Sequence, residues 1–139
     1  MRKRTKQKRN FEIKFYEGLL KNRPDFIEAL SLLGNVYTKR GMFEKGLEVD
    51  LRLSELKPYD PIVYYNLACS YSLLGKLEES LRALKRAVLL GYEDLAYALK
   101  DKDLKMLRDY KPFKDFLYKV ERNMLSKTSS SVKCSGGNK

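Results

Sequence analysis

Histidine is absent from all 139 residues of the sequence. The chain therefore lacks the commonest general base, the commonest protein ligand for metal ions, and every Ser-His-Asp or Cys-His arrangement. Neither of the two common glycine-rich phosphate-binding loops is present. We therefore expect no enzymatic activity, no bound metal and no cofactor.

Cysteine is scarce as well, because the chain has only Cys69 and Cys134. The first lies within a helical pattern and the second in a Ser/Gly-rich stretch, which is typical of free thiols and too sparse for a disulfide framework or a zinc site. No run approaches the roughly 18 apolar residues of a membrane span. The basic start is not followed by the apolar segment of a signal peptide. These absences predict a cytoplasmic protein.

Residues that favour strands or interrupt helices are few. Val and Ile are sparse, no stretch alternates apolar and polar residues for long, and there are four prolines and eight glycines. The composition is 43% hydrophobic and 34% charged, which is typical of a helix-rich globular domain. The length allows one domain with a useful core.

The net charge of +11 is concentrated at the two ends of the chain. Residues 1–9 carry six basic groups and no acid, and residues 126–139 carry three lysines and no acid. Residues 10–125 then hold 20 basic against 18 acidic groups. We predict a basic segment over 1–10, either a flexible arm or a charged lead-in to the first helix, and a disordered tail over 126–139.

Between these ends, apolar residues recur every three to four positions and predict a series of helices. The first covers about 11–23. Four more follow over about 26–40, 43–56, 61–74 and 77–90, with Leu47 and Leu51 facing inward in the third. Short helical pieces are expected around 95–99 and 104–109, and a final helix from Pro112.

Local signals predict where these helices begin and end. Asp25, with Glu28 three residues later, forms a capping-box pattern for the second helix. Asp60 is the predicted cap of the fourth, with Pro61 at the first helical position, where its missing N–H costs nothing. Glycine is suited to a left-handed helix end, and it follows three of the predicted helices, at Gly41, Gly75 and Gly91.

Internal repetition is the most informative feature of the sequence. Residues 27–60 align with 61–94 without a gap, giving two units of 34 residues. The aligned positions keep their size pattern: Leu30 with Tyr64, Leu33 with Leu67, Gly34 with Ala68, Tyr37 with Tyr71, Gly41 with Gly75, and in the second helices Leu53 with Ala87, followed by Pro58 in the first unit. This pattern resembles the tetratricopeptide repeat family.

The resemblance implies an all-α fold, a short right-handed superhelix of antiparallel helix pairs. Its parts are a half repeat over 11–26, full repeats over 27–60 and 61–94, and a degenerate helical cap over 95–125 that resembles the end of short bacterial members. One departure is Asp50, which stands where the family has a bulky aromatic and where the second unit has Leu84. Small Gly34 and Ala68 are expected where paired helices approach closely.

In this family the first helix of each unit lines a concave groove, so the resemblance implies a non-catalytic scaffold that binds a peptide or helix of a partner protein there. Some members hold a peptide's terminal carboxylate with a lysine and asparagines. Asn35 and Asn66 match that pattern, but Ser31 stands at the lysine position, and Lys39 or Lys100 would have to replace it. The groove candidates are Glu28, Ser31, Asn35, Thr38, Lys39, Ile62, Tyr65, Asn66, Cys69, Ser72 and Lys100, with Leu73 beside them.

Two alternatives stay open. The basic segment, with Arg2, Lys3, Arg4, Lys6, Lys8 and Arg9, could bind nucleic acid or an anionic surface with salt-dependent affinity, or could serve only to keep the chain soluble. The half repeat leaves an apolar face that could dock a partner or form a homodimer. The sequence does not name the partner protein.

Overall fold

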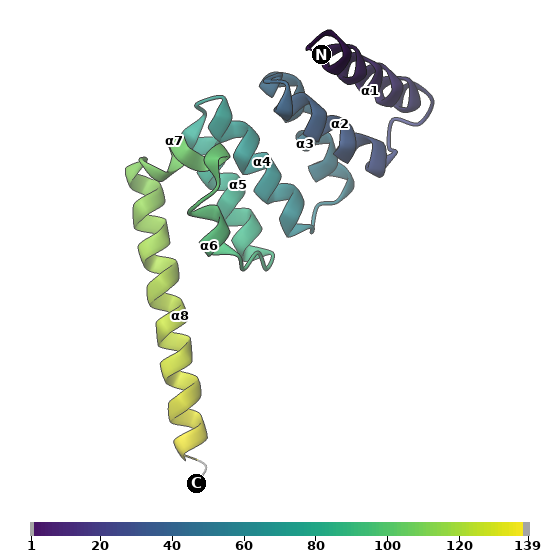
Figure 1. Ribbon diagram of the computed structural model, residues 1–139. Coiled ribbons are helices and arrows are strands. Elements are labelled where there is room, and N and C mark those ends of the chain that lie inside the picture. Colours follow the sequence, from purple (N-terminus) through teal and green to yellow (C-terminus); the bar gives the residue numbers. More distant parts are fainter. Residues whose placement is uncertain (1, 138–139) are drawn as a thin grey trace.

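The computed structural model describes the backbone of residues 2–137 and the side chains of residues 10–123 and 125. Within these residues the chain is helical and contains no strand. The elements are α1 (Arg2–Asn22), α2 (Ile27–Lys39), α3 (Phe43–Leu56), α4 (Pro61–Leu73), α5 (Leu77–Leu89), α6 (Leu95–Ala98), the 3₁₀ helix η1 (Lys102–Leu104), α7 (Lys105–Arg108) and α8 (Lys111–Gly137). Figure 1 shows successive helices packed as antiparallel neighbours, with α8 extending away from the stack.

The two predicted repeat units are present as helical hairpins. The first consists of α2 and α3, and the second of α4 and α5. Equivalent helices begin 34 residues apart, at Ile27 and Pro61 and again at Phe43 and Leu77. The all-helical stack of antiparallel pairs is therefore confirmed.

The predicted cap of the second helix at Asp25 is wrong. Residues 24 and 25 form a turn, and the N-cap of α2 is Phe26, whose side chain makes no capping hydrogen bond. Glu28 consequently has no capping box to complete. The 34-residue period explains the difference, because it places Phe26, and not Asp25, at the position of Asp60 in the next unit.

The other predicted ends are confirmed. Asp60 accepts a hydrogen bond from the Ile62 N–H at 2.9 Å, with Pro61 following as the first helical residue. Gly41, Gly75 and Gly91 adopt φ values of 77°, 74° and 111°. A side chain is strained in that region, so glycine is the residue these helix ends require.

The repeat signature builds the core, which forms two clusters. One joins α1 to the first hairpin through Ile13, Leu30, Leu33, Tyr37, Val49, Leu53 and Val63. The other joins the second hairpin to the cap, and includes Leu67, Ala68, Leu81, Leu84 and Ala87. Tyr64 and Tyr71 pack against its edge, whereas Pro58 lies exposed in the turn between the units.

The inward face of α3 differs from the prediction at one position. Leu51 was expected to face inward but is 38% exposed. The buried residues of this helix are Gly46, Leu47, Val49, Asp50 and Leu53. Since α3 contacts both α2 and α4, its buried stripe follows those two neighbours, and the exposed side carries Leu51.

Gly34 lies where α2 and α3 approach closely, as the small-residue pattern predicted. A Cβ placed on Gly34 would meet Val49 Cγ1 at 3.2 Å and Asp50 Oδ1 at 3.6 Å. In the second unit, Ser80 on the facing helix donates a hydrogen bond to the Ala68 carbonyl at 2.7 Å. The hairpins are therefore held together by backbone approach as well as by apolar contact.

We expect Gly34→Leu to lower the free energy of unfolding by about 1–3 kcal/mol or more, because the larger side chain would push α2 and α3 apart. Gly18 on α1 is the control, since a Cβ there would meet nothing within 4 Å. Gly18→Ala should instead stabilise the helix by about 0.5–1 kcal/mol. Urea unfolding monitored by circular dichroism measures both, and an unchanged midpoint for Gly34→Leu would contradict the close approach.

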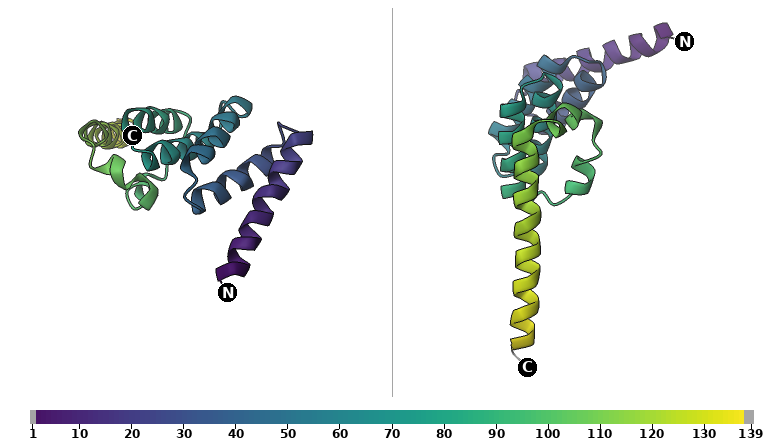
Figure 2. Two further views of the ribbon diagram at one scale, coloured as in Figure 1. Left: turned by 90° about the horizontal axis from the view of Figure 1, so that it is seen from above. Right: turned by 90° about the vertical axis from the view of Figure 1, so that its left-hand side faces the viewer.

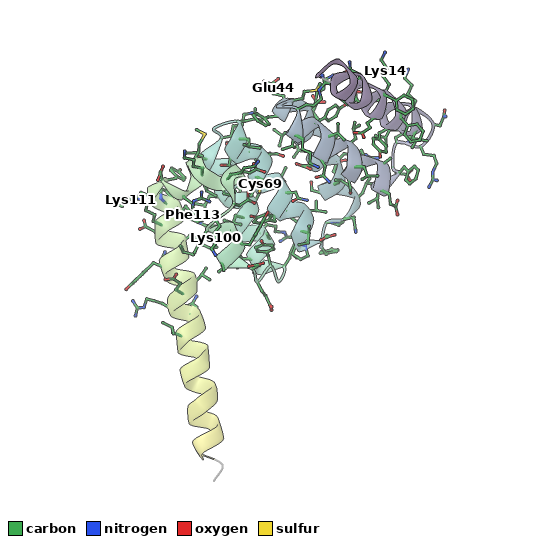
Figure 3. The ribbon with its side chains drawn as sticks, viewed as in Figure 1. Lys14, Glu44, Cys69, Lys100, Lys111 and Phe113 are labelled. Carbon is green, nitrogen blue, oxygen red and sulfur yellow. The ribbon has the colours of Figure 1, made fainter. Side chains whose placement is uncertain are left out.

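The cap closes the second hairpin. Leu104 and Leu107 are fully buried and Phe113 is 3% exposed, all within the cluster that includes α4 and α5. The Arg108 guanidinium donates to the carbonyls of Ala98 at 3.2 Å and Asp101 at 2.5 Å, which joins α7 to the segment before it. Figure 3 shows Phe113 at the start of α8, where this helix meets the stack.

The backbone is helical at both ends of the chain over the described residues. The backbone of residues 2–9 is the first part of α1, which corresponds to the charged lead-in and not to the flexible arm. Over residues 126–137 the backbone continues α8, where a disordered tail was predicted. The last two residues of that tail lie outside the described residues.

Candidate functional site: an inner groove ending at a tyrosine–aspartate corner

An open groove of about 800 Å³ runs along the inner side of α2 and α4. Its floor includes α3 residues, and its far end is closed by the segment from Tyr92 to Asp103. Figure 2 shows that α8 leaves the stack and extends beyond the hairpins, so it does not cover the pair α2 and α4. The first helices of both units thus face one shared space.

Most of the groove candidates line this space. Eight of them do so: Ser31, Asn35, Thr38, Lys39, Ile62, Tyr65, Asn66 and Cys69, together with Leu73. Glu28, Ser72 and Lys100 do not. Glu28 and Lys100 are exposed elsewhere, and Figure 3 shows Lys100 beside the cap segment.

Ser72 is placed in the interior and not in the groove. It is fully buried, and its hydroxyl is the one buried side-chain polar atom without a hydrogen-bond partner among the described residues. The reason is that α4 is enclosed on several sides, by α3, α5, η1 and α7. A helix that is covered on several sides buries more of its residues than a helix that packs through one apolar stripe, and Ser72 is among these additional residues.

The middle of the groove offers polar groups to a ligand. Asn35 and Asn66 are exposed, and neither side-chain amide is bonded to another described residue. Thr38 differs, because its hydroxyl donates to the Gly34 carbonyl at 3.0 Å. The two asparagines can therefore each donate and accept a hydrogen bond from a bound chain.

The far end of the groove is a tyrosine–aspartate corner, formed by Tyr65, Tyr92, Tyr97, Asp101 and Asp103. The Tyr65 and Tyr92 rings stack with centroids 4.5 Å apart, and the Tyr97 ring lies 6.2 Å from Tyr65. The Tyr65 hydroxyl donates to Asp101 Oδ2 at 2.6 Å. Asp101 Oδ1 accepts from the Asp103 N–H at 3.0 Å and so caps η1.

Burial and negative charge raise the pKa of the groups around this corner. Burial, reinforced by the Asp101 carboxylate, raises the pKa values of the Tyr65 hydroxyl and the Cys69 thiol. Cys69 is therefore a protonated, unreactive thiol at neutral pH. Burial and the nearby Asp101 also raise the pKa of Asp103. The corner is thus a negatively charged site that is surrounded by neutral tyrosine rings.

Another carboxylate, that of Asp50 on α3, lies in the floor of the groove. It is 8% exposed and accepts a hydrogen bond from the Ser70 hydroxyl. Burial raises its pKa from 3.8 to about 6, against the opposing effect of the Ser70 hydrogen bond. At neutral pH this buried group is therefore charged at a cost in stability.

The charges that line the groove affect whether it could hold the terminal carboxylate of a peptide, as some members of the resembled family do. Lys100 lies outside the groove, so Lys39 is the one residue of the two considered replacements that lines it. Against the ammonium groups of Lys39, Lys57 and Lys102, four carboxylates line the same space: Asp50, Asp60, Asp101 and Asp103. Their repulsion opposes a bound carboxylate, most strongly near the corner.

Sequence reasoning missed Asp50 and four of the five corner residues as groove residues: Tyr92, Tyr97, Asp101 and Asp103. Asp101 caps η1, as an acid at the start of a helix commonly does, but its second oxygen accepts a hydrogen bond from the Tyr65 hydroxyl. Asp50 was noted as a departure from the repeat pattern. That departure was the available signal, since a charged residue at a core position of a repeat has to face something polar.

The alternatives to the groove are not tested by these contacts. The side chains of residues 2–9 lie outside the described residues, so nucleic-acid binding by the basic segment stays a prediction. Phe11 and Phe15 on α1 are 69% and 52% exposed, and a docking role for that face stays a prediction too. Among the described residues, no helix combines the length and apolarity needed to cross a bilayer, and no three potential ligands gather as a metal site would need.

Stacked helical hairpins that enclose an inner groove define a helical-repeat protein of the α-solenoid class. Residues 62–90 match the tetratricopeptide repeat family. The match lies in the second of the two 34-residue units and agrees with the repeat signature predicted there.

Relatives and solved structures agree with that assignment. A chloroplastic protein from Arabidopsis thaliana is 31% identical over 99 residues, which is 69% of this chain and 30% of that protein. The crystal structure of MamA is 26% identical with a TM-score of 0.65, over 82% of this chain and 65% of that one. Residues 41-end of MamA from Desulfovibrio magneticus RS-1 share the fold at 24% identity, with a TM-score of 0.66 over 88% and 70% of the chains.

The chain thus spans less than a third of the Arabidopsis relative and about two thirds of the first MamA chain. The Arabidopsis protein is described as chloroplastic. The cytoplasmic location expected from the sequence stays a prediction.

Proposed function

We propose that this protein is a non-catalytic scaffold that binds an extended peptide segment of a partner protein in the groove between α2 and α4. The observation that carries the proposal is the exposed pair Asn35 and Asn66 within one open space of about 800 Å³. An extended peptide has unpaired backbone N–H and C=O groups at regular intervals. Side-chain amides that are themselves unpaired satisfy them without disturbing the helices.

The groove is also partly apolar, as such an interface needs. Ile62 is 54% exposed at one side of the lining, and the half-buried Tyr92 lies at the far end. These side chains give a bound segment apolar contact area, while the asparagines fix its register. A scaffold of this kind needs no catalytic group.

The proposal is tested by selecting binders from a random-peptide display library against the immobilised full chain. Selected peptides should lose about tenfold or more in affinity for the Asn35→Ala, Asn66→Ala double variant, measured by fluorescence anisotropy. Two hydrogen bonds of about 0.5–1.5 kcal/mol each account for that factor.

The matched control is the double variant Glu48→Ala, Arg82→Ala. Both residues are exposed, on the second helices of the two units, and neither lines the groove. Peptide affinity should be unchanged in this variant. Failure to select any binder, or binders that do not distinguish the two double variants, would contradict the proposal.

A further inference from the structure

The tyrosine–aspartate corner holds two carboxylates that form no ion pair with a described side chain, although Lys102 lines the same groove. The ion pairs among the described residues join Arg52 to Glu55, Lys57 to Asp60 and Arg82 to Glu78, so none of them includes Asp101 or Asp103. Lys102 lies between these two aspartates in sequence and is exposed. Its charge favours the ionised form of Asp103 without forming an ion pair.

The two carboxylates differ in the number of hydrogen bonds that they accept from described residues. Asp101 is held by the Tyr65 hydroxyl at 2.6 Å and by the Asp103 N–H at 3.0 Å. Asp103 makes no side-chain hydrogen bond to another described residue, although it is partly buried. A group placed in the groove beside Asp103 would therefore relieve a desolvated and unpaired charge.

The tyrosine rings complete an environment suited to a cation. Tyr97 is 55% exposed, so part of its ring is open to a ligand, while Tyr65 and Tyr92 stack beside it. An aromatic face attracts a cation through its quadrupole, and this attraction adds to that of nearby carboxylates. Neutral apolar ligands gain from the rings alone, and anionic ligands are repelled.

We infer that the corner binds a lysine or arginine side chain of the peptide that occupies the groove. The inference rests on the proposed function and adds to it the charge of the partner at one end. The cationic head would lie against Asp103 and the Tyr97 ring, and its aliphatic stem would extend back along the groove toward Asn66. The partner segment is therefore basic at this position.

The first experiment uses a small probe that does not depend on an identified partner. Nα-acetyl-lysine N-methylamide is titrated into the full chain at low ionic strength, and the ring resonances of Tyr65 and Tyr97 are followed by NMR. The norleucine counterpart has nearly the same stem without the charge, and glycine N-methylamide supplies a free N-terminal ammonium instead. We expect saturable shifts with the lysine probe and none with norleucine at equal concentration.

Variants locate the binding. Asp103→Asn and Tyr97→Leu should each weaken the lysine probe by about three- to tenfold. Asp115→Asn removes an exposed aspartate of α8 that does not line the groove, and Tyr59→Leu removes a 77% exposed tyrosine outside it. Both controls should leave the affinity unchanged. Equal shifts from norleucine, stronger binding of glycine N-methylamide, or an unaltered Asp103→Asn affinity would overturn the inference.

The second experiment separates this inference from the proposed function. In the display-selected peptides, a basic residue should recur at one position, and its replacement by norleucine should cost about tenfold in the wild type and much less in Asp103→Asn. Peptides that bind through Asn35 and Asn66 without any preference for a basic residue would overturn the inference and leave the scaffold function standing. If the lysine probe binds the corner but no peptide is selected, the proposed scaffold function fails and the cation-binding corner stands.

Discussion

Replacing Leu84 with alanine should lower the free energy of unfolding by about 2–5 kcal/mol. Leu84 lies on α5 with no exposed surface, in the cluster that joins the second hairpin to the buried cap residues Leu104 and Leu107. Because the residues of this cluster come from several separate elements, they cannot all move inward to fill the space that the leucine leaves. The loss therefore includes a cavity as well as the transfer free energy of the removed carbons.

Leu89→Ala is the matched control for this prediction. Leu89 is on the same helix and is 77% exposed, so its truncation should change stability by less than about 0.5 kcal/mol. Chemical denaturation of the two variants gives the comparison directly. Equal midpoints would mean that Leu84 does not face the core of the protein, which would contradict the packing of α5 in the second hairpin.

Asp50→Asn should stabilise the protein at pH 7.5 by up to about 3 kcal/mol, and by much less at pH 4. The folded protein holds the pKa of Asp50 at about 6, above its ordinary value of 3.8, because burial disfavours the charge. A shift of this size corresponds to about 3 kcal/mol between the two protonation states. Asparagine keeps an oxygen that can accept the Ser70 hydrogen bond and has no charge to bury.

The direction of the pH dependence follows from proton linkage. Between about pH 4 and 6, folded Asp50 binds a proton that the unfolded chain has released, so the wild-type free energy of unfolding falls as the pH rises through this window. The stabilising contribution of protonated Asp50 is complete below about pH 4 and lost above about pH 6. The difference between variant and wild type should therefore grow from pH 4 to pH 7.

Asp60→Asn provides a control of opposite sign. Burial tends to raise the pKa of Asp60, but the Lys57 ammonium 3.1 Å away and the Ile62 N–H together lower it. Its stabilising contribution is present at neutral pH and is lost on acidification, so this variant should be less stable than wild type at neutral pH and approach it in acid. Urea unfolding from about pH 2 to 7.5 measures both variants, since the Asp60 contribution is lost only below about pH 4. A flat difference for Asp50→Asn would show that burial does not raise the pKa of Asp50 in the folded protein.

The groove was predictable in outline because its lining follows the repeat. Asn35 and Asn66 lie on the inner helices, and the helix period alone places them on the same side as Ser31 and Ile62. Ser72 lies on the same helix as Asn66, yet it is buried. Its position depends on η1 and α7, which do not belong to the repeat and whose docking is not encoded in the 34-residue period.

The sequence by itself determined the helical hairpins and their spacing. Apolar residues at helical intervals, glycines at the helix ends and small residues at Gly34 and Ala68 meet local requirements, and each can be recognised from its own stretch of chain. Only the tertiary structure decided which charged and polar side chains contact one another. Asp101 and Tyr65 are 36 residues apart and come together because the cap folds back onto α4. Such contacts depend on how several elements pack at once, and no single stretch of sequence carries that information.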